Sequence, residues 1–116
     1  MLNGKTYHED FKGHKGCIGP GDIQWMTAGK GIVHSEMPGS FEEMSVGFQL
    51  WLNLRSDKKM GEPKYQEYTK EQIPTIEKNG NKVTVICGEW EGTKGVIKYE
   101  TPSIYFLVEL GENGTF

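Results

Sequence analysis

Short apolar segments bracketed by glycine turns are the feature that most restricts the fold of this chain. Residues 23–26 (IQWM) lie between GPGD at 19–22 and TAGKG at 27–31. Glycine and proline favour tight turns between short strands and disfavour helix interiors. Because the chain carries 16 glycines and 5 prolines in 116 residues, it is predicted to be all-β.

Strand-like patterns recur along the whole chain. In residues 48–54 and 104–110, apolar and polar side chains alternate, which gives each strand one strongly apolar face. Between residues 69 and 81, Pro74 limits any helix to about one turn, so this stretch is a connector. Strands are predicted over residues 6–10, 16–18, 23–26, 32–37, 48–54, 83–87, 96–99 and 104–110.

Charge and cysteine content narrow the classes of function. Lysine and arginine number 13 against 16 acidic residues, and they form no basic stripe, so no direct nucleic-acid binding is expected. The longest apolar run, residues 104–108, is too short to cross a membrane.

Cys17 and Cys87 lack CxxC spacing, and a disulfide between them is left open. Without a signal-peptide pattern, a cytoplasmic or nuclear location, or both, is expected.

His34 and Glu36 form the clearest candidate site. Residues two apart on a strand point to the same face and lie about 7 Å apart along it. An imidazole and a carboxylate so placed can hold one transition-metal ion. Gly29 and Gly31 are expected to permit positive φ angles in the turn that aims this strand. On spacing alone, a buried histidine beside a glutamate that forms an ion pair is the more common arrangement.

The residues around this pair carry a family resemblance. HEDFKGHKGCIGPGDIQWMTAGKGIVHSEMP at residues 8–38 closely resembles the signature region of the pirins, metal-binding proteins of the cupin superfamily. The similarity continues through QLWLNLRS at 49–56 and KMGEPKYQE at 59–67. The resemblance implies an all-β, jelly-roll type cupin barrel. A full-length pirin has two such barrels, so this chain would form only part of that structure and is expected to be truncated at both ends.

The resemblance also implies a domain organisation. Residues 1–80 correspond to the later part of the first barrel and a connector, and residues 81–116 to the opening strands of the second. The Asn-Gly turn before residue 81 places the boundary near residue 80, and we expect both parts to pack as one compact domain. A partial barrel leaves unpaired strand edges, so a homodimer that completes the barrel is expected.

In pirins, the residues at the positions of His34 and Glu36 supply half of a site that resembles a mononuclear iron centre. The other two ligands come from a His-x-His motif on an earlier strand, which would lie before Met1. The resemblance therefore implies two of the ligands for iron, as Fe²⁺, or another divalent first-row metal. An N-terminal extension or a partner chain would supply the others.

The remaining histidines and the tryptophans receive structural interpretations. His8 and His14 are six residues apart, which is not a recognised ligand spacing, and they are interpreted as hydrogen-bonded surface or edge residues of a hairpin. Trp25, Trp51 and Trp90 are interpreted as packing residues rather than as a substrate-stacking set.

Three functions follow from the resemblance. The first is a metal-binding, redox-sensitive regulator that acts through protein partners, as pirins do in nuclear co-regulation of transcription. The second is a metal-dependent oxygenase similar to quercetin 2,3-dioxygenase, in which Glu36 is a ligand or a catalytic base. The third is a truncated paralogue that has kept the fold and lost catalytic activity.

Overall fold

The computed structural model describes residues 1–116 as an all-β chain in two compact units, Met1–Lys70 and Glu71–Phe116. The prediction of the all-β class is confirmed, and the strands form separate small sheets with no closed barrel. The predicted domain boundary near residue 80 stays a prediction. The assignment of the two parts to two barrels of a longer protein stays a prediction.

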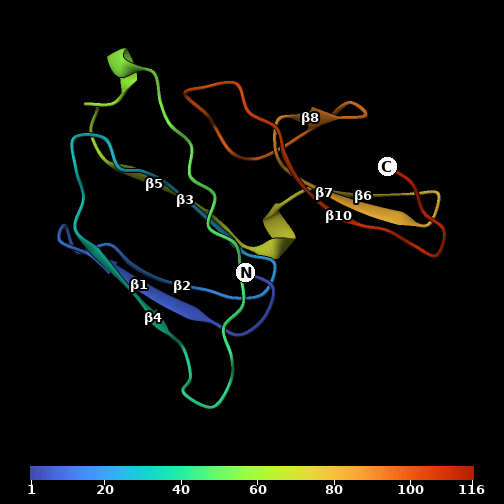
Figure 1. The fold of residues 1–116 in the computed structure, drawn as a ribbon, viewed down its shortest axis with the longest axis horizontal. Helices are drawn as coiled ribbons and strands as arrows, with labels where there is room; N and C mark the ends of the chain where they lie inside the picture. The colour runs from blue at the N-terminus through green and yellow to red at the C-terminus, as the bar shows by residue number, and fades with distance from the viewer. The chain divides into compact units, whose positions relative to one another are not determined.

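The first unit consists of two small antiparallel sheets (Figure 1). β1 (Thr6–Asp10) is the central strand of one sheet, between β2 (Lys15–Ile18) and β4 (His34–Pro38). β3 (Ile23–Thr27) pairs with β5 (Lys64–Tyr68) to form the other. A hairpin turn joins β1 to β2 locally, whereas β5 reaches β3 from far along the sequence.

Glycines set the turn that leads into β4. Gly29 and Gly31 have φ angles of 57° and 128°, as predicted. A Cβ atom on Gly29 would lie 2.1 Å from the carbonyl oxygen of Gly61, so a side chain there would meet the backbone. The backbone N–H of Lys30 donates to the same carbonyl. This turn therefore fixes where the strand that carries His34 begins.

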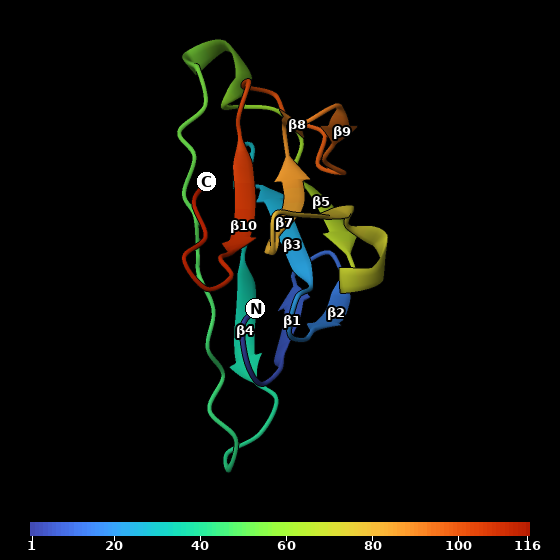
Figure 2. The same ribbon diagram turned by 90° about the vertical axis from the view of Figure 1, so that its right-hand side faces the viewer.

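The second unit centres on the seven-residue strand β7 (Asn81–Cys87). It lies between β6 (Thr75–Lys78) and β10 (Tyr105–Glu109) in an antiparallel sheet, and β7 and β10 run side by side in Figure 2. A short hairpin, β8 (Glu89–Trp90) and β9 (Thr93–Lys94), follows β7.

Helical structure is confined to two short 3-10 turns, η1 (Ser56–Lys58) and η2 (Lys70–Gln72). The second lies in the connector, where one helical turn before Pro74 was predicted. Neither turn approaches the length or the apolar character that a membrane-crossing helix requires.

The buried hydrophobic residues all belong to the second unit. β7 contributes most of them: it is paired along both edges, and its alternate residues Val83, Val85 and Cys87 share one buried face. In the first unit, the buried residues are Gly4, His8 and Asp10. The hydrophobic core comprises Ile73, Val83, Val85, Ile86, Cys87 and Ile97.

Two predicted strands are not formed. Residues 48–54 run as an extended segment with no strand partner, drawn in green in Figure 1. Residues 96–99 join β7 through one backbone hydrogen bond, from the N–H of Ile97 to the carbonyl of Ile86. Both predictions were wrong because a strand-like local pattern does not supply the neighbouring strand that a ladder needs.

Candidate functional site

β1 and β4 bring four ionisable side chains to one face of the first sheet. In their antiparallel register, Asp10 lies opposite His34 and His8 lies opposite Glu36. Residues directly opposite one another project to the same face. The predicted pair His34 and Glu36 therefore shares its face with a histidine and an aspartate from the neighbouring strand. The role of the pair as metal ligands stays a prediction.

His8 is buried on this face, with an exposed fraction of 6%. Its Nε2 lies 2.7 Å from Oε1 of Glu67 on β5, so Nε2–H donates to that carboxylate. Gly16 of β2 leaves room for the ring, because a Cβ atom there would lie 2.4 Å from the imidazole. The interpretation of His8 as a surface or edge residue was therefore wrong: it joins the two sheets of the first unit.

Asp10 and His14 form a second pair in the β1–β2 hairpin. Nδ1 of His14 lies 2.7 Å from Oδ2 of Asp10, and the backbone N–H groups of Lys12 and His14 donate to Oδ1 at 2.8 and 3.0 Å. Burial works to raise the pKa of Asp10, but these hydrogen bonds outweigh burial and hold the pKa below its ordinary value. The carboxylate is therefore ionised at neutral pH.

Tyr65 on β5 covers both histidines. Its ring is stacked on that of His8, with centroids 6.4 Å apart, and lies 5.5 Å from that of His14. Burial raises the pKa of its hydroxyl, and the charge of Asp10 and a hydrogen bond with it raise the pKa further. Tyr65 therefore stays protonated and can donate to the Asp10 carboxylate.

His34 and Glu36 are open to solvent, unlike His8 and Asp10. Oε2 of Glu36 accepts a hydrogen bond of 2.7 Å from Nε2 of Gln49, and the side chain of His34 forms no hydrogen bond or ion pair. An imidazole nitrogen and a carboxylate oxygen are suitable donors for a divalent first-row metal. No group of three or more such side chains is arranged to hold a metal ion. The residues present therefore fit half of a metal site.

One buried nitrogen on this face lacks a partner. Nδ1 of His8 has no hydrogen bond, although Nε2 of the same ring is bonded to Glu67. With the proton on Nε2, Nδ1 carries a free lone pair, which costs less to bury than an unpaired N–H group. The ring is held in one tautomer by Glu67.

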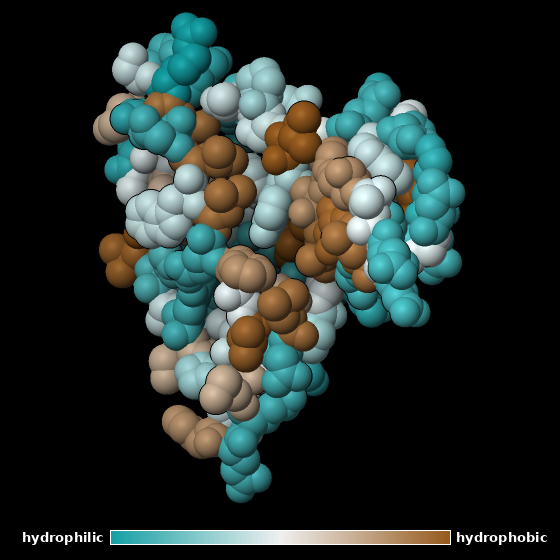
Figure 3. All heavy atoms as spheres, turned by 45° about the vertical axis from the view of Figure 1, so that its right-hand side comes forward, coloured by the Kyte–Doolittle hydropathy of each residue, from teal (hydrophilic) through white to brown (hydrophobic).

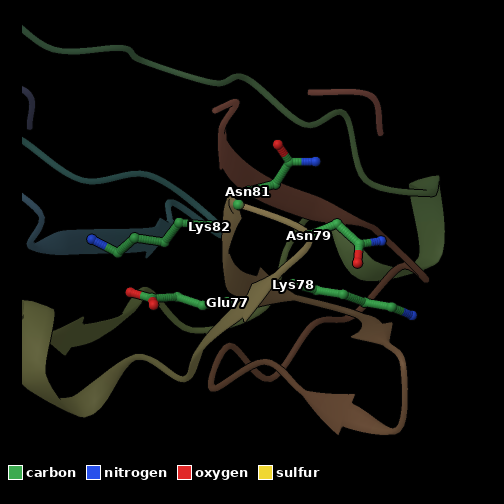
Figure 4. Close-up of a pocket in the computed structure, with 6 residues that line it drawn as sticks. Glu77, Lys78, Asn79, Asn81 and Lys82 are labelled. Carbon is green, nitrogen blue, oxygen red and sulfur yellow. The ribbon is translucent and has the colours of Figure 1, made fainter. Parts of the chain in front are cut away.

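A hollow of about 320 Å³ lies in the second unit, around the β6–β7 hairpin. Figure 4 shows Glu77 and Lys82 extending to one side of this hairpin and Lys78 and Asn79 to the other. Lys78 is already paired with Glu91, and Lys82 with Glu109. The hollow follows the outside of a turn and brings together no set of catalytic or metal-binding groups.

Sequence reasoning missed two members of the cluster, Tyr65 and Glu67. They lie two apart on β5 and so point to the same face, and the alternation in KYQEY was a signal for this strand. That signal is polar and aromatic rather than aliphatic, so it did not suggest a strand against β3.

The chain is an all-β protein of short antiparallel strands with imidazole and carboxylate groups on one face of a sheet, which is compatible with a cupin-like fold. The solved structures that the chain resembles agree. It matches GK1651 from Geobacillus kaustophilus with a TM-score of 0.80 and 40% identity, covering 87% of this chain and 40% of that one. It matches a quercetin 2,3-dioxygenase from Acinetobacter baumannii with a TM-score of 0.73 and 35% identity, covering 87% and 37%.

Sequence comparison identifies the family. The family model described as Pirin matches residues 1–52. Human Pirin is 55% identical over 110 residues, covering 95% of this chain and 38% of that protein. Pirin-like protein 2 of Arabidopsis thaliana is 52% identical over 105 residues, covering 90% and 32%. The chain belongs to the pirin family and spans about a third of the length of these relatives.

Proposed function

We propose that this chain is a metal-binding pirin-like protein in which His34 and Glu36 are two ligands of a divalent first-row metal, with iron as the first candidate. The carrying observation is that both side chains lie on one face of β4 and are open to solvent. His34 has no competing partner, so its imidazole is free to coordinate. In the purified chain, solvent or a partner chain supplies the remaining ligands.

The neighbouring residues of this chain position and tune that pair. Gln49 donates to one oxygen of Glu36 and leaves the other for a ligand bond. Asp10, opposite His34, is held ionised and adds negative charge on the same face. A bound metal would supply Lewis-acid or redox chemistry at this face. Carboxylates so placed favour a cation over a neutral ligand.

The proposed biological role is regulation through protein partners. A metal that changes oxidation state changes the charge next to an exposed sheet face, and such a change can bias the binding of a partner. This role follows from family membership, and the exposed position of the His34 and Glu36 pair supports it. We expect it in the cytoplasm, the nucleus or both.

A quercetin 2,3-dioxygenase-like activity is the second candidate function. The similarity to the Acinetobacter baumannii protein favours it, at 35% identity over 87% of this chain. In such a reaction Glu36 would act as a ligand or as a base that accepts the proton of a substrate hydroxyl. Oxygen-dependent loss of quercetin absorbance, abolished by His34→Ala, would support the enzyme. Absence of turnover with every divalent metal tested would leave a non-catalytic paralogue.

The metal content of the purified chain tests the proposal. After anaerobic loading with Fe²⁺ and gel filtration, inductively coupled plasma mass spectrometry is expected to find bound iron in the wild-type chain and its loss in His34→Ala. His14→Gln is the matched control, because it also removes one histidine and lies outside the proposed ligand pair. Metal-free wild-type chain, or equal iron in His34→Ala, would contradict the proposal.

A further inference from the structure

The hairpin that joins β6 to β7 has Asn79 and Gly80 as its two turn residues. Lys78 pairs with Asn81 and closes the turn. Asn79 and Gly80 have φ angles of 54° and 76°, so both lie in the left-handed region that a type I′ turn requires. The peptide N–H of Gly80 stands outside the ladder and forms no hydrogen bond. The geometry of the turn itself therefore leaves this nitrogen without a partner.

The side chain of Asn79 is equally unrestrained. Its amide group forms no hydrogen bond, and Figure 4 shows it on the side of the turn opposite Glu77 and Lys82. A Cβ atom on Gly80 would meet nothing within 4 Å, so the peptide after Asn79 has space to rotate. Asparagine is a chemically labile residue, and a following glycine has no side chain to hinder attack by its own nitrogen.

Water has access to this turn. Figure 3 shows both hydrophobic side chains, in brown, and hydrophilic ones, in teal, at the surface of the chain. Apart from Gly80, every residue of the run EKNGNK at 77–82 is of the hydrophilic kind. A labile amide, a free nitrogen and water, the co-reactant that deamidation needs, are therefore present together at one hairpin.

We propose that Asn79 is a site of spontaneous deamidation. The backbone nitrogen of Gly80 attacks Cγ of Asn79 and forms a carbon–nitrogen bond. The bond between Cγ and the side-chain nitrogen breaks, and ammonia leaves with the proton that Gly80 gives up. Water then opens the cyclic imide at either carbonyl, which yields aspartate or isoaspartate. The reaction needs no other reagent and does not depend on the proposed metal site.

The same dipeptide at Asn3 and Gly4 is restrained by its neighbours. Nδ2 of Asn3 donates to the carbonyl of Met44 at 2.9 Å. Asn3 and Val46 also exchange two backbone hydrogen bonds, of 3.1 and 2.9 Å. Gly4 is buried, and a Cβ atom there would lie 2.8 Å from the carbonyl oxygen of Met44. The amide must leave its acceptor, and the peptide must leave its bridge, before Asn3 can react.

A third copy of the dipeptide, Asn113 with Gly114, is restrained at the attacking nitrogen. The backbone N–H of Gly114 donates to the carbonyl of Gly111 at 2.9 Å. The buried side chain of Asn81 holds both flanks, since it accepts from the N–H of Gly111 at 3.0 Å and donates to the carbonyl of Thr115 at 2.8 Å. The fold therefore distinguishes Asn79 from two asparagines with the same following residue.

Deamidation at Asn79 changes the hairpin in which it occurs. Isoaspartate places its Cβ atom in the main chain, so the two-residue turn becomes one atom longer. The longer turn no longer matches the register in which Ile76 lies opposite Val83, a fully buried residue of β7. Aspartate leaves the main chain unchanged, and Asp-Gly suits the same turn. Isoaspartate is therefore the product that loosens β6 from β7.

Peptide mapping by mass spectrometry after incubation of the whole folded chain tests the site. We expect conversion at Asn79 to be at least about fivefold faster than at Asn3 or Asn113, the factor that releasing one hydrogen bond contributes. In urea the three sites should convert at similar rates, because the same two residues react. No conversion at Asn79, faster conversion at either other site, or the same order in urea would overturn the proposal.

The effect on the hairpin is tested with separated products. Both products carry one more negative charge than the wild type, so ion exchange separates them from it, and mapping assigns the isoaspartyl fraction. Freshly prepared Asn79→Asp is the matched control, because it has the same charge and an unchanged main chain. We expect the isoaspartyl fraction to unfold at lower urea than Asn79→Asp. Equal unfolding midpoints would overturn the loosening of β6 from β7.

Discussion

Asp10 is the residue at which most polar contacts of the β1–β2 hairpin meet. Its carboxylate accepts hydrogen bonds from two backbone N–H groups and is paired with the ring of His14. Tyr65 is a further hydrogen-bond partner. The residue is buried, so it depends on these donors to stay charged. The shape of this hairpin, and with it the position of His8, rests on one ionised side chain.

Replacing Asp10 by asparagine is expected to lower stability in a pH-dependent way. The pKa of Asp10 lies below its ordinary value of 3.8, so its stabilising effect is present above that value. The effect is lost as the pH falls through the lower folded-state pKa. The difference between wild type and Asp10→Asn should therefore be largest near neutral pH and shrink in acid.

Urea unfolding at pH 7 and pH 3 measures this difference, followed by Trp25 fluorescence with Trp51 and Trp90 replaced by phenylalanine. Glu9→Gln is the control on the same strand, because Glu9 forms only an exposed ion pair with Lys15. An equal difference in the free energy of unfolding at both pH values would show that the charge of Asp10 does not contribute to stability.

At the scale of elements, β7 organises the second unit. It is hydrogen-bonded on both edges, and Val83, Val85 and Cys87 are fully buried. Burial raises the pKa of the Cys87 thiol, which keeps it neutral and unreactive. Gly95 allows a neighbouring segment to approach, because a Cβ atom there would lie 2.6 Å from the backbone of Ile86.

Val85→Ala should lower the free energy of unfolding of the second unit by about 1.5 to 3 kcal/mol, since it removes two buried methyl groups and leaves a cavity. Lys82→Gln, on the same strand but part of a surface ion pair with Glu109, should change it by less than about 1 kcal/mol. Urea unfolding followed by Trp90 fluorescence measures both. Similar values for the two variants would contradict the central role of β7.

Short-range sequence patterns predicted the elements that depend only on neighbouring residues. β1, β2 and β3 follow glycine turns that are visible in the sequence, and the placement of His34 and Glu36 on one face follows from spacing on one strand. β5 was missed because its partner β3 lies about 40 residues earlier and no local pattern encodes that pairing. Glu67 and the burial of His8 were missed for the same reason, since their contact depends on how the two sheets of the first unit meet.

For the molecule as a whole, hydrophobic burial and candidate chemistry lie in different units. Glu71–Phe116 contains the buried hydrophobic residues, whereas Met1–Lys70 contains His34, Glu36 and the buried polar pair His8 and Asp10. Burial of apolar surface is the main driving force for folding. The first unit is therefore expected to be the less stable of the two.

Hydrogen exchange measured by mass spectrometry should show this difference. Amides of β7 are expected to exchange slowest, and those of residues 48–54 fastest in dilute protein, because the latter have no backbone partner. Amides of β1 should fall between these extremes. Equal protection across both units would contradict the assignment of stability to the second.

The location of the core also determines what a melting experiment on this chain can detect. A ligand raises the unfolding temperature only of the cooperative unit that binds it. The sharp part of a melting curve will come from Glu71–Phe116, where hydrophobic side chains are buried. Where the two units unfold independently, metal bound at His34 and Glu36 will leave that transition unchanged. A screen based on thermal shift will then miss metal binding at β4. The nuclear magnetic resonance signals of the His34 imidazole will detect it.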